Sequence, residues 1–249
     1  MLTEERHALI QKELEKQGSM TLTALCVLLN TSESTVRRDL SILAEKGKLI
    51  RVRGGAMSLR DAIASPERTK EEKERRNSEE KDRIARYAAS LLTDGDIIFL
   101  DAGTTTGKMI GFLPEKQATF VTNSLSHAKA LCQRGFKVFL PAGEIRLSTE
   151  AIVGAECVST LMNYNFSKSF IGTNGISLAG GISTPDRGEA SVKHAAIRNS
   201  REAFVLADHT KFDRITSVRF SELNKVTIIT DRLRNETYRS YANIREAIL

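Results

Sequence analysis

Hydrophobic residues in the first fifty positions recur at helical spacing in three successive stretches. The pattern predicts helices over residues 3–18, 21–29 and 33–46, because apolar positions three and four residues apart share one helix face. Ser32 is a favourable N-cap for the third helix, and Gly47 supplies its stop. The inward-facing residues are Leu9, Ile10, Leu14, Leu22, Leu25, Leu28, Leu29, Val36, Leu40 and Leu43.

The second and third predicted helices are joined by a turn of only a few residues, which is typical of a helix-turn-helix. Hydroxyls and arginines on the outer face of the third helix suit contacts with phosphates and base edges. Residues 48–56 alternate basic and apolar side chains before Gly54-Gly55, which indicates a small β wing. The alternative is a three-helix domain for protein contacts. The predicted DNA-binding residues are Ser34, Thr35, Arg37, Arg38, Arg51 and Arg53.

The remaining chain divides into a connector and a larger domain. Residues 57–76 alternate charges and carry few large apolar side chains, which favours an exposed linker or a solvated helix. We therefore predict a winged helix-turn-helix over 1–56, a linker over 57–76 and a second domain over 77–249. Because the linker joins the two domains covalently, we expect it to transmit any signal between them.

The larger domain alternates short apolar runs with amphipathic stretches. This alternation predicts an α/β fold with a mainly parallel sheet. Helices are expected over residues 153–163 and at the C-terminus, where Tyr238, Tyr241, Ile244 and Ile248 share a face. The predicted strands cover 97–100, 119–121, 137–140, 169–171, 203–207 and 226–230.

The first of these strands, expected to be buried on both faces, leads into a corner that suits an anion. Asp101 ends the strand, Gly103 allows close approach of a ligand, and three threonines open the next helix. Free amides and the positive end of a helix dipole meet there, so the corner can hold a phosphate. A plain β–α turn with a threonine N-cap is the alternative.

Polar residues also follow the other strands, and ligands of open parallel sheets bind at the carboxyl ends of the strands. Glu189 and Lys193 are four residues apart on one predicted helix and can face the same cleft, or form a surface ion pair. Phosphate-binding threonines and lysines beside hydroxyl-binding carboxylates and amides indicate a sugar phosphate. The predicted ligand-binding residues are Asp101, Gly103, Thr104, Thr105, Thr106, Thr122, Asn123, Ser124, Gly143, Gly172, Asn174, Gly175, Asp186, Glu189, Lys193, Asp208 and Lys211.

Composition and charge favour a cytoplasmic protein with an acidic partner over a secreted or membrane-spanning protein. The 249 residues carry 41% hydrophobic and 27% charged side chains and a net charge of +6, which favours an acidic partner. Three widely spaced cysteines favour reduced thiols in a cytoplasm. The charged N-terminus does not fit a signal peptide, and no apolar run is long enough for a membrane span. The histidines show no metal spacing; His194 and His209 are expected at the cleft edge or surface, and neither metal nor cofactor is predicted.

Several motifs together resemble the DeoR-type family of bacterial sugar-operon transcriptional repressors. These are TEERHALI, STVRRDLSILAEKGKLIRVRGGA, DAGTTT, VTNS, GTNGI, GGISTPD and ADHTKF, which span almost the whole chain. The resemblance implies a winged helix and a sensor domain resembling ribose-5-phosphate isomerase. It also implies the residues at its own motifs: Ser34, Thr35, Arg37, Arg38 and Arg53 for DNA, and Asp101, Thr104, Thr105, Asn123, Gly172, Asn174, Asp186, Glu189, Lys193, Asp208 and Lys211 for the effector.

Within that family the sequence looks closest to repressors of fructose and lactose operons. Candidate effectors are therefore fructose-1-phosphate and tagatose-6-phosphate, and expected partners are double-stranded operator DNA and further copies of the chain, as a dimer or tetramer. Residues 141–144 depart from the family, which often has a Gly-Gly pair there.

Two alternatives to a repressor are an activator and a sugar-phosphate isomerase. An isomerase needs a positioned general base, and the related isomerases carry acids where this chain reads Gly172-Thr173-Asn174-Gly175. We therefore predict that the protein is not an enzyme.

Overall fold

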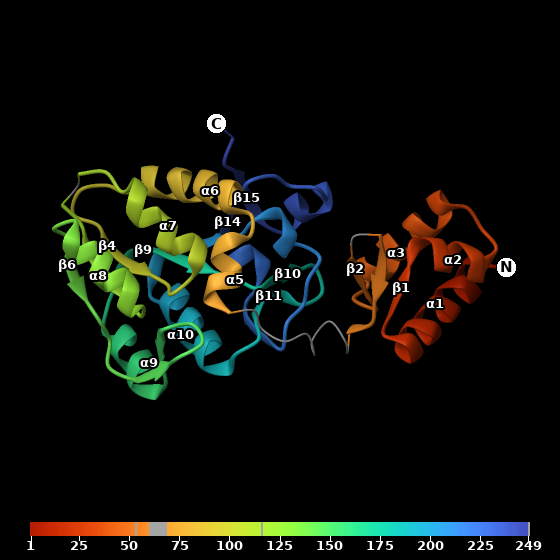
Figure 1. Cartoon of the computed structure of the whole chain (residues 1–249), viewed down its shortest axis with the longest axis horizontal. Helices are drawn as coiled ribbons and strands as arrows, with labels where there is room; N and C mark the ends of the chain where they lie inside the picture. The colour runs from red at the N-terminus through yellow and green to blue at the C-terminus, as the bar shows by residue number, and fades with distance from the viewer. Residues whose placement is uncertain (53, 60–68, 116, 249) are drawn as a thin grey trace.

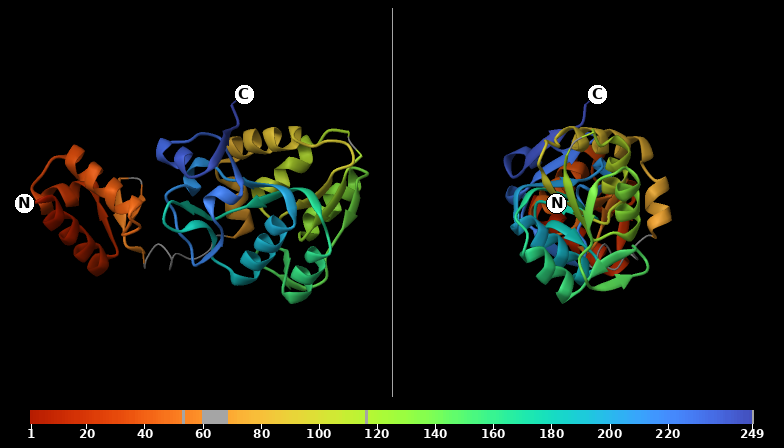
Figure 2. Two further views of the ribbon diagram at one scale, coloured as in Figure 1. Left: turned by 180° about the vertical axis from the view of Figure 1, so that it is seen from behind. Right: turned by 90° about the vertical axis from the view of Figure 1, so that its left-hand side faces the viewer.

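The computed structural model describes residues 1–52, 54–59, 69–115 and 117–248, which form two domains lying end to end (Figures 1 and 2). The smaller, N-terminal domain contains the predicted three helices and the wing. An additional strand, β1, completes a three-stranded sheet in the order β1-β3-β2. Its elements are α1 Thr3–Gln17, β1 Ser19–Thr21, α2 Leu22–Leu29, α3 Glu33–Glu45, β2 Ile50–Val52 and β3 Gly55–Met57.

Side-chain contacts fix the position of α3 in this domain. Ser32 accepts a hydrogen bond from the Thr35 amide at 3.4 Å, which confirms the predicted N-cap. The buried carboxylate of Asp39 accepts hydrogen bonds from Arg6 at 2.7 and 3.1 Å, and His7 lies 3.1 Å away. These bonds join α1 to α3. The Arg6–Asp39 contact was not predicted, because the two residues are far apart in the sequence.

A parallel sheet forms the centre of the larger domain, as predicted, and it has seven strands where six were expected. The strand order is β15-β14-β12-β9-β4-β5-β6, and every neighbouring pair is parallel. The bounds are β4 Ile97–Leu100, β5 Thr119–Thr122, β6 Lys137–Phe139, β9 Phe166–Gly172, β12 Ser200–Leu206, β14 Thr227–Thr230 and β15 Asn243–Glu246.

Helices cover both faces of this sheet, so successive strand residues enter different cores (Figure 1). Ile98 and Leu100 pack beneath one helix layer, whereas Phe99 packs beneath the other. Ile97, however, is partly exposed, so the first strand is not buried on both faces throughout. None of the described helices is long and apolar enough to cross a membrane. The first layer is α6 Ser78–Ser90, α7 Thr104–Phe112 and α8 Leu125–Gln133; the second is α9 Ala155–Met162 and α10 Arg187–Arg198.

Smaller elements surround the sheet, and of these only a solvated helix within residues 57–76 was among the expectations. β7 pairs with β8, and β10, β11 and β13 form a three-stranded antiparallel sheet. A short helix, α5, occupies part of the predicted linker. The bounds are α5 Lys70–Arg75, β7 Glu144–Arg146, β8 Ala151–Val153, β10 Gly175–Ser177, β11 Gly181–Thr184 and β13 Val218–Ser221, with 3₁₀ turns at His209–Lys211, Leu223–Lys225 and Glu236–Ser240.

The predicted C-terminal helix is wrong. Only a 3₁₀ turn forms around Tyr238, and residues 243–246 form β15, which pairs in parallel with β14. Tyr238 is fully buried, and its hydroxyl donates to Asp213 at 2.9 Å. Completing the sheet and burying this ring outweigh the helical spacing of the apolar residues. The helix expected over 153–163 is likewise shorter, because residues 151–153 belong to β8.

His127 is buried between two helices of the first layer. A Cβ at Gly107 of α7 would lie 2.6 Å from its Nε2, so the helices approach closely there. Its Nδ1 has no hydrogen-bond partner among the described residues. Burial, together with the charge of Lys70, lowers the pKa of His127 to about 4. The folded protein therefore holds this ring neutral.

We predict that His127 makes the protein acid-sensitive. Below about pH 6.5 the unfolded chain binds a proton that the folded chain does not bind until about pH 4. The free energy of unfolding should therefore fall by up to about 1.4 kcal/mol per pH unit across that window. Urea titrations at several pH values should show a smaller slope for His127→Gln. The exposed His194 serves as control, and an unchanged slope in His127→Gln would contradict the assignment.

Candidate functional site

The strongest candidate for a ligand site lies between β4 and β9, where the direction in which successive strands are added to the sheet reverses. From β4 the chain continues outward through β5 and β6, whereas β9 begins the strands on the other side of β4. Such a switch point opens a crevice at the carboxyl ends of the two central strands. A cavity occupies this place in the fold. Its lining includes, among the predicted residues, Gly103, Thr104, Thr105, Gly172, Asn174, Glu189, Lys193 and Lys211.

The first turn of α7 forms the floor of one end. Thr106 donates to the carbonyl oxygens of Asp101 and Gly103 and accepts from the Gly103 amide, which closes the turn. Thr104 and Thr105 line the cavity at the helix N-terminus, where backbone amides have no intrahelical partner. This arrangement suits an anionic oxygen. Thr106 is fully buried and supports the turn instead of facing the ligand.

Lysines gather at the same end, and three of them were missed in the sequence. Lys81 is only 3% exposed, and its ammonium group donates to Thr104 Oγ1 at 3.1 Å and to the backbone carbonyl of Lys73. Lys70 also lines the cavity, and its ammonium group donates to Glu150 at 2.5 Å. Lys81 shares the buried face of α6 with Ile84, at helical spacing, and this was the signal for its burial.

Burial lowers the pKa values of two lysines at this end of the cavity. It lowers the pKa of Lys211 to about 8, only partly opposed by Asp208, and the charge of Lys81 lowers it further. Burial likewise lowers the pKa of Lys81. Crowding ammonium groups away from water is unfavourable unless an anion neutralises them. The free volume is about 60 Å³, so these side chains must move aside for a larger ligand.

A carboxylate occupies the other part of the lining. Glu189 accepts hydrogen bonds from Arg146 and Thr149, each at 2.9 Å, and from Thr184 at 3.4 Å. Burial opposes its ionisation, but Lys193 and these donors hold the pKa of Glu189 below its usual value. Asn174 accepts from Thr184 at 3.1 Å. An oriented carboxylate and amide beside cavity threonines can bind hydroxyl groups.

Glu189 and Lys193 are buried, so they are not a surface ion pair. Lys193 instead donates to Asp101 Oδ2 at 2.5 Å, and the Gly172 amide donates to the same oxygen at 2.8 Å. Asp101 is 2% exposed. It therefore joins β4, β9 and α10 beneath the cavity instead of lining it.

Other predicted ligand residues also support the cavity from outside its lining. Asn123 accepts from the Ala102 amide at 3.0 Å and donates to the Ile152 carbonyl at 3.1 Å. Ser124 and Asp186 cap α8 and α10. Asp208 accepts from Asn77 and from the Thr210 amide, each at 3.0 Å. The predicted residues outside the lining are Asp101, Thr106, Thr122, Asn123, Ser124, Gly143, Gly175, Asp186 and Asp208.

The local structure of Thr122, Gly143 and Gly175 explains why these three predicted residues do not line the cavity. Thr122 is fully buried and accepts from the Ser124 amide at 3.2 Å. Gly143 packs against β8, where a Cβ would lie 2.5 Å from the Val153 carbonyl oxygen. Gly175 begins β10, where a Cβ would lie 2.7 Å from the Arg214 carbonyl oxygen. Close packing therefore explains both glycines.

His209 is buried, contrary to the prediction. Its Nδ1 lies 2.8 Å from Asp231 Oδ2, and its Nε2 lies 3.2 Å from Arg232. Glu80 brings a further carboxylate, and the three ligand atoms lie within 4.8 Å of one another. Because both ring nitrogens already have partners, the arrangement is explained by side-chain hydrogen bonding. His194 is exposed, as predicted.

Four of the six predicted DNA-facing residues belong to α3, and Arg51 belongs to β2. Arg37 and Arg38 are exposed, and Arg37 pairs weakly with Glu33 at 3.3 Å. The hydroxyls of Ser34 and Thr35 lie 2.9 and 3.0 Å from that of Ser32. Arg51 is directed to Ser41, to which it donates at 2.8 Å. Arg53 lies outside the described residues.

Comparison with known proteins matches both domains to one family. A model described as the DeoR C terminal sensor domain matches residues 76–232, and one described as the DeoR-like helix-turn-helix domain matches residues 6–62. A Bacillus subtilis (strain 168) protein named "Uncharacterized HTH-type transcriptional regulator FruR" is 43% identical over 97% of this chain and 96% of its own length. The Staphylococcus aureus (strain N315) "Lactose phosphotransferase system repressor" is 35% identical over 94% and 96%. Among solved structures, ribose 5-phosphate isomerase A from Methanocaldococcus jannaschii is 18% identical, with a TM-score of 0.41, over 55% of both chains.

We predict that Lys193→Met destabilises the larger domain. The substitution leaves Asp101 as a buried carboxylate without its cation, which should lower the free energy of unfolding by about 3–5 kcal/mol. Combining it with Asp101→Asn should recover part of that loss. Denaturant titrations measure both, with the exposed Lys129→Met as control. Equal stability of Lys193→Met and the unaltered protein would show that the pair contributes nothing.

Proposed function

The chain belongs to the DeoR family of transcriptional regulators, and we propose that it represses a sugar-catabolic operon until a phosphorylated sugar releases it from operator DNA. The observation that carries the effector assignment is the cationic end of the switch-point cavity, where Lys81 and Lys211 adjoin the N-terminus of α7. The first relatives are named regulators and repressors, which supports regulation over catalysis.

DNA binding is assigned to the exposed face of α3. Hydrogen bonds to Asp39 hold this helix against α1, so its N-terminal half has a fixed orientation. A recognition helix presents such residues to the major groove, where arginine can bind guanine through two hydrogen bonds. Operators read in this way contain repeated half-sites, so we propose that a dimer or tetramer binds.

The effector is assigned from the two ends of the cavity. The lysines and helix amides suit a phosphate, and Glu189 with Asn174 suits the hydroxyls of a sugar. The names of the fructose-type and lactose-type relatives support fructose-1-phosphate and tagatose-6-phosphate as first candidates.

A thermal-shift panel tests this assignment. It compares both sugar phosphates with free fructose and with inorganic phosphate. A ligand that binds only the folded state raises the melting temperature by mass action. The proposal requires a shift with a sugar phosphate that the free sugar does not give. Equal shifts with the free sugar would refute the phosphate site, and a reporter assay with and without the gene decides between repression and activation.

Lys211→Met should weaken sugar-phosphate binding without abolishing DNA binding. Loss of one charged hydrogen-bond donor should cost about 1.5–3 kcal/mol of effector binding free energy. In the unaltered protein, affinity should also fall as the pH rises through about 8, because deprotonated Lys211 no longer attracts phosphate. Calorimetric titration at several pH values measures both effects. The exposed Lys225→Met is the control; the same affinity and pH profile in Lys211→Met would remove Lys211 from the site.

Arg37→Ala and Arg38→Ala should each weaken operator binding if that arginine contacts a base. The expected loss is about 1–3 kcal/mol of binding free energy. Binding of the unaltered protein should weaken steeply with salt, because contacts with phosphates release counterions. Gel-shift titrations measure these effects, with the distant, exposed Arg201→Ala as control. Full affinity in the double alanine variant would refute the proposed DNA surface.

A further inference from the structure

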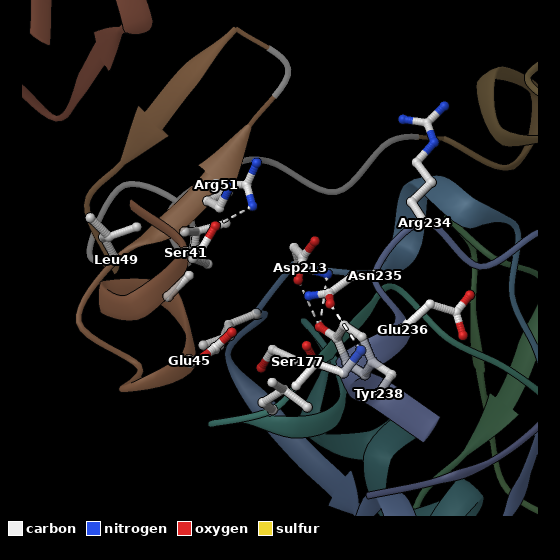
Figure 3. A pocket seen from close by; sticks show the side chains of 15 residues that line it. Ser41, Glu45, Leu49, Arg51, Ser177, Asp213, Arg234, Asn235, Glu236 and Tyr238 are labelled. Atoms are coloured by element: carbon white, nitrogen blue, oxygen red, sulfur yellow. Dashed lines mark hydrogen bonds between the residues drawn. The ribbon is translucent and has the colours of Figure 1, made fainter. Parts of the chain in front are cut away.

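A second, larger cavity of about 380 Å³ lies between the two domains (Figure 3). The DNA-binding domain contributes the C-terminal end of α3 and strand β2, including Glu45 and Arg51. The sensor domain contributes Leu178, Asp213 and Tyr238, from three separate segments. The two domains therefore face each other across a partly filled space.

Direct contact occurs beside this cavity, at the turn that ends α3. Gly47 has a φ of +66°, and a Cβ built there would lie 2.5 Å from the Cβ of Ala179. Ala179 lies at the tip of the β10–β11 hairpin, between Ser177 and Gly181. The recognition helix thus ends against a hairpin of the sensor domain.

The same hairpin begins and ends at the switch-point cavity. Thr173 and Asn174 line that cavity and lead directly into β10. At the end of β11, Thr184 donates to Asn174 at 3.1 Å and to Glu189 at 3.4 Å. One hairpin therefore has its base in the ligand cavity and its tip against the DNA-binding domain.

The loop that follows Lys211 runs parallel to this connection. Lys211 lines the ligand cavity, whereas Asp213 and Ile215 line the cavity between the domains. The Arg214 amide donates to the Ile176 carbonyl at 3.2 Å. The Tyr238 hydroxyl joins the loop to the hairpin, because it donates to Asp213 at 2.9 Å and lies 3.3 Å from the Ile176 carbonyl. Loop and hairpin can thus move as one body.

We propose that this sensor surface is a docking face for the DNA-binding domain of the same chain, and that effector binding acts on DNA through it. The docking face comprises Ser177, Leu178, Ala179, Asp213, Ile215 and Tyr238. The part of this proposal that concerns the effector rests on the function proposed above. A ligand that displaces Asn174 and Lys211 shifts the hairpin and loop and loosens α3 from its fixed orientation. The signal then crosses a surface contact and is not carried by the linker alone.

Docking is tested first without ligand, by amide hydrogen exchange of residues 43–50 in the full chain. Ala179→Arg places a long side chain against Gly47 and should undock the domain. Exchange of residues 43–50 should then rise by about tenfold or more, as local opening becomes easier. Ser159→Arg makes the same change in bulk and charge at an exposed position on α9 and should have no effect. Unchanged exchange in Ala179→Arg would overturn the docking face.

Coupling is tested next with fructose-1-phosphate and tagatose-6-phosphate, each first shown to bind by a thermal shift. In the unaltered protein a bound sugar phosphate should speed exchange of residues 43–50 and weaken DNA binding by about 5–150-fold. In Ala179→Arg it should still bind but change DNA affinity much less. Binding without faster exchange, or full release from DNA in Ala179→Arg, would overturn the coupling.

Failure of the proposed effector is recognised separately, because then neither sugar phosphate shifts the melting temperature. Asn174→Ala serves in that case, since it removes the bond to Thr184 at the hairpin base without any ligand. Faster exchange of residues 43–50 in Asn174→Ala would support transmission along the hairpin, and unchanged exchange would overturn it.

Discussion

The buried contact between Asp101 and Lys193 determines the geometry of the sensor domain. Asp101 ends one central strand, Lys193 projects from α10, and the Gly172 amide at the end of the other central strand shares the same carboxylate oxygen. Removing two charges from water is costly, so their partners must be placed accurately. Three elements that diverge at the switch point are thereby held together, and the crevice above them has a fixed floor.

The Asp101–Lys193 contact bears on the distribution of charge in the cavity, which has a carboxylate on one side and lysines on the other. Lys193 lines the cavity and pairs with Asp101 beneath it, and Glu189 accepts hydrogen bonds from Arg146 and Thr149. On the opposite side, burial lowers the pKa of both Lys81 and Lys211, and the charge of Lys81 lowers the pKa of Lys211 further. An anion bound among these lysines would relieve their repulsion. The cationic end of the unliganded cavity therefore suits an anionic group, such as the phosphate of the proposed effector.

Sequence patterns predicted those features that depend on neighbouring residues. The β4 strand, the threonine turn and the Ser32 cap are local, and each was recognisable from spacing and residue type. The errors arise where distant segments meet. Residues 243–246 form a strand because β14 offers an edge with which they can pair. Helix α5 brings Lys70 and Lys73 to a cavity whose lining extends as far along the chain as Lys211. The ion pair between Arg6 and Asp39 was missed for the same reason.

The imperfect packing between the domains is consistent with regulation. A space of about 380 Å³ beside the Gly47–Ala179 contact leaves part of the boundary between the two domains unpacked. Docking there is consequently weaker than the internal packing of either domain. Allosteric coupling typically involves only about 1–3 kcal/mol, and a tightly packed interface would resist so small a bias. A ligand that moves one hairpin can therefore alter the orientation of α3, while both hydrophobic cores stay intact.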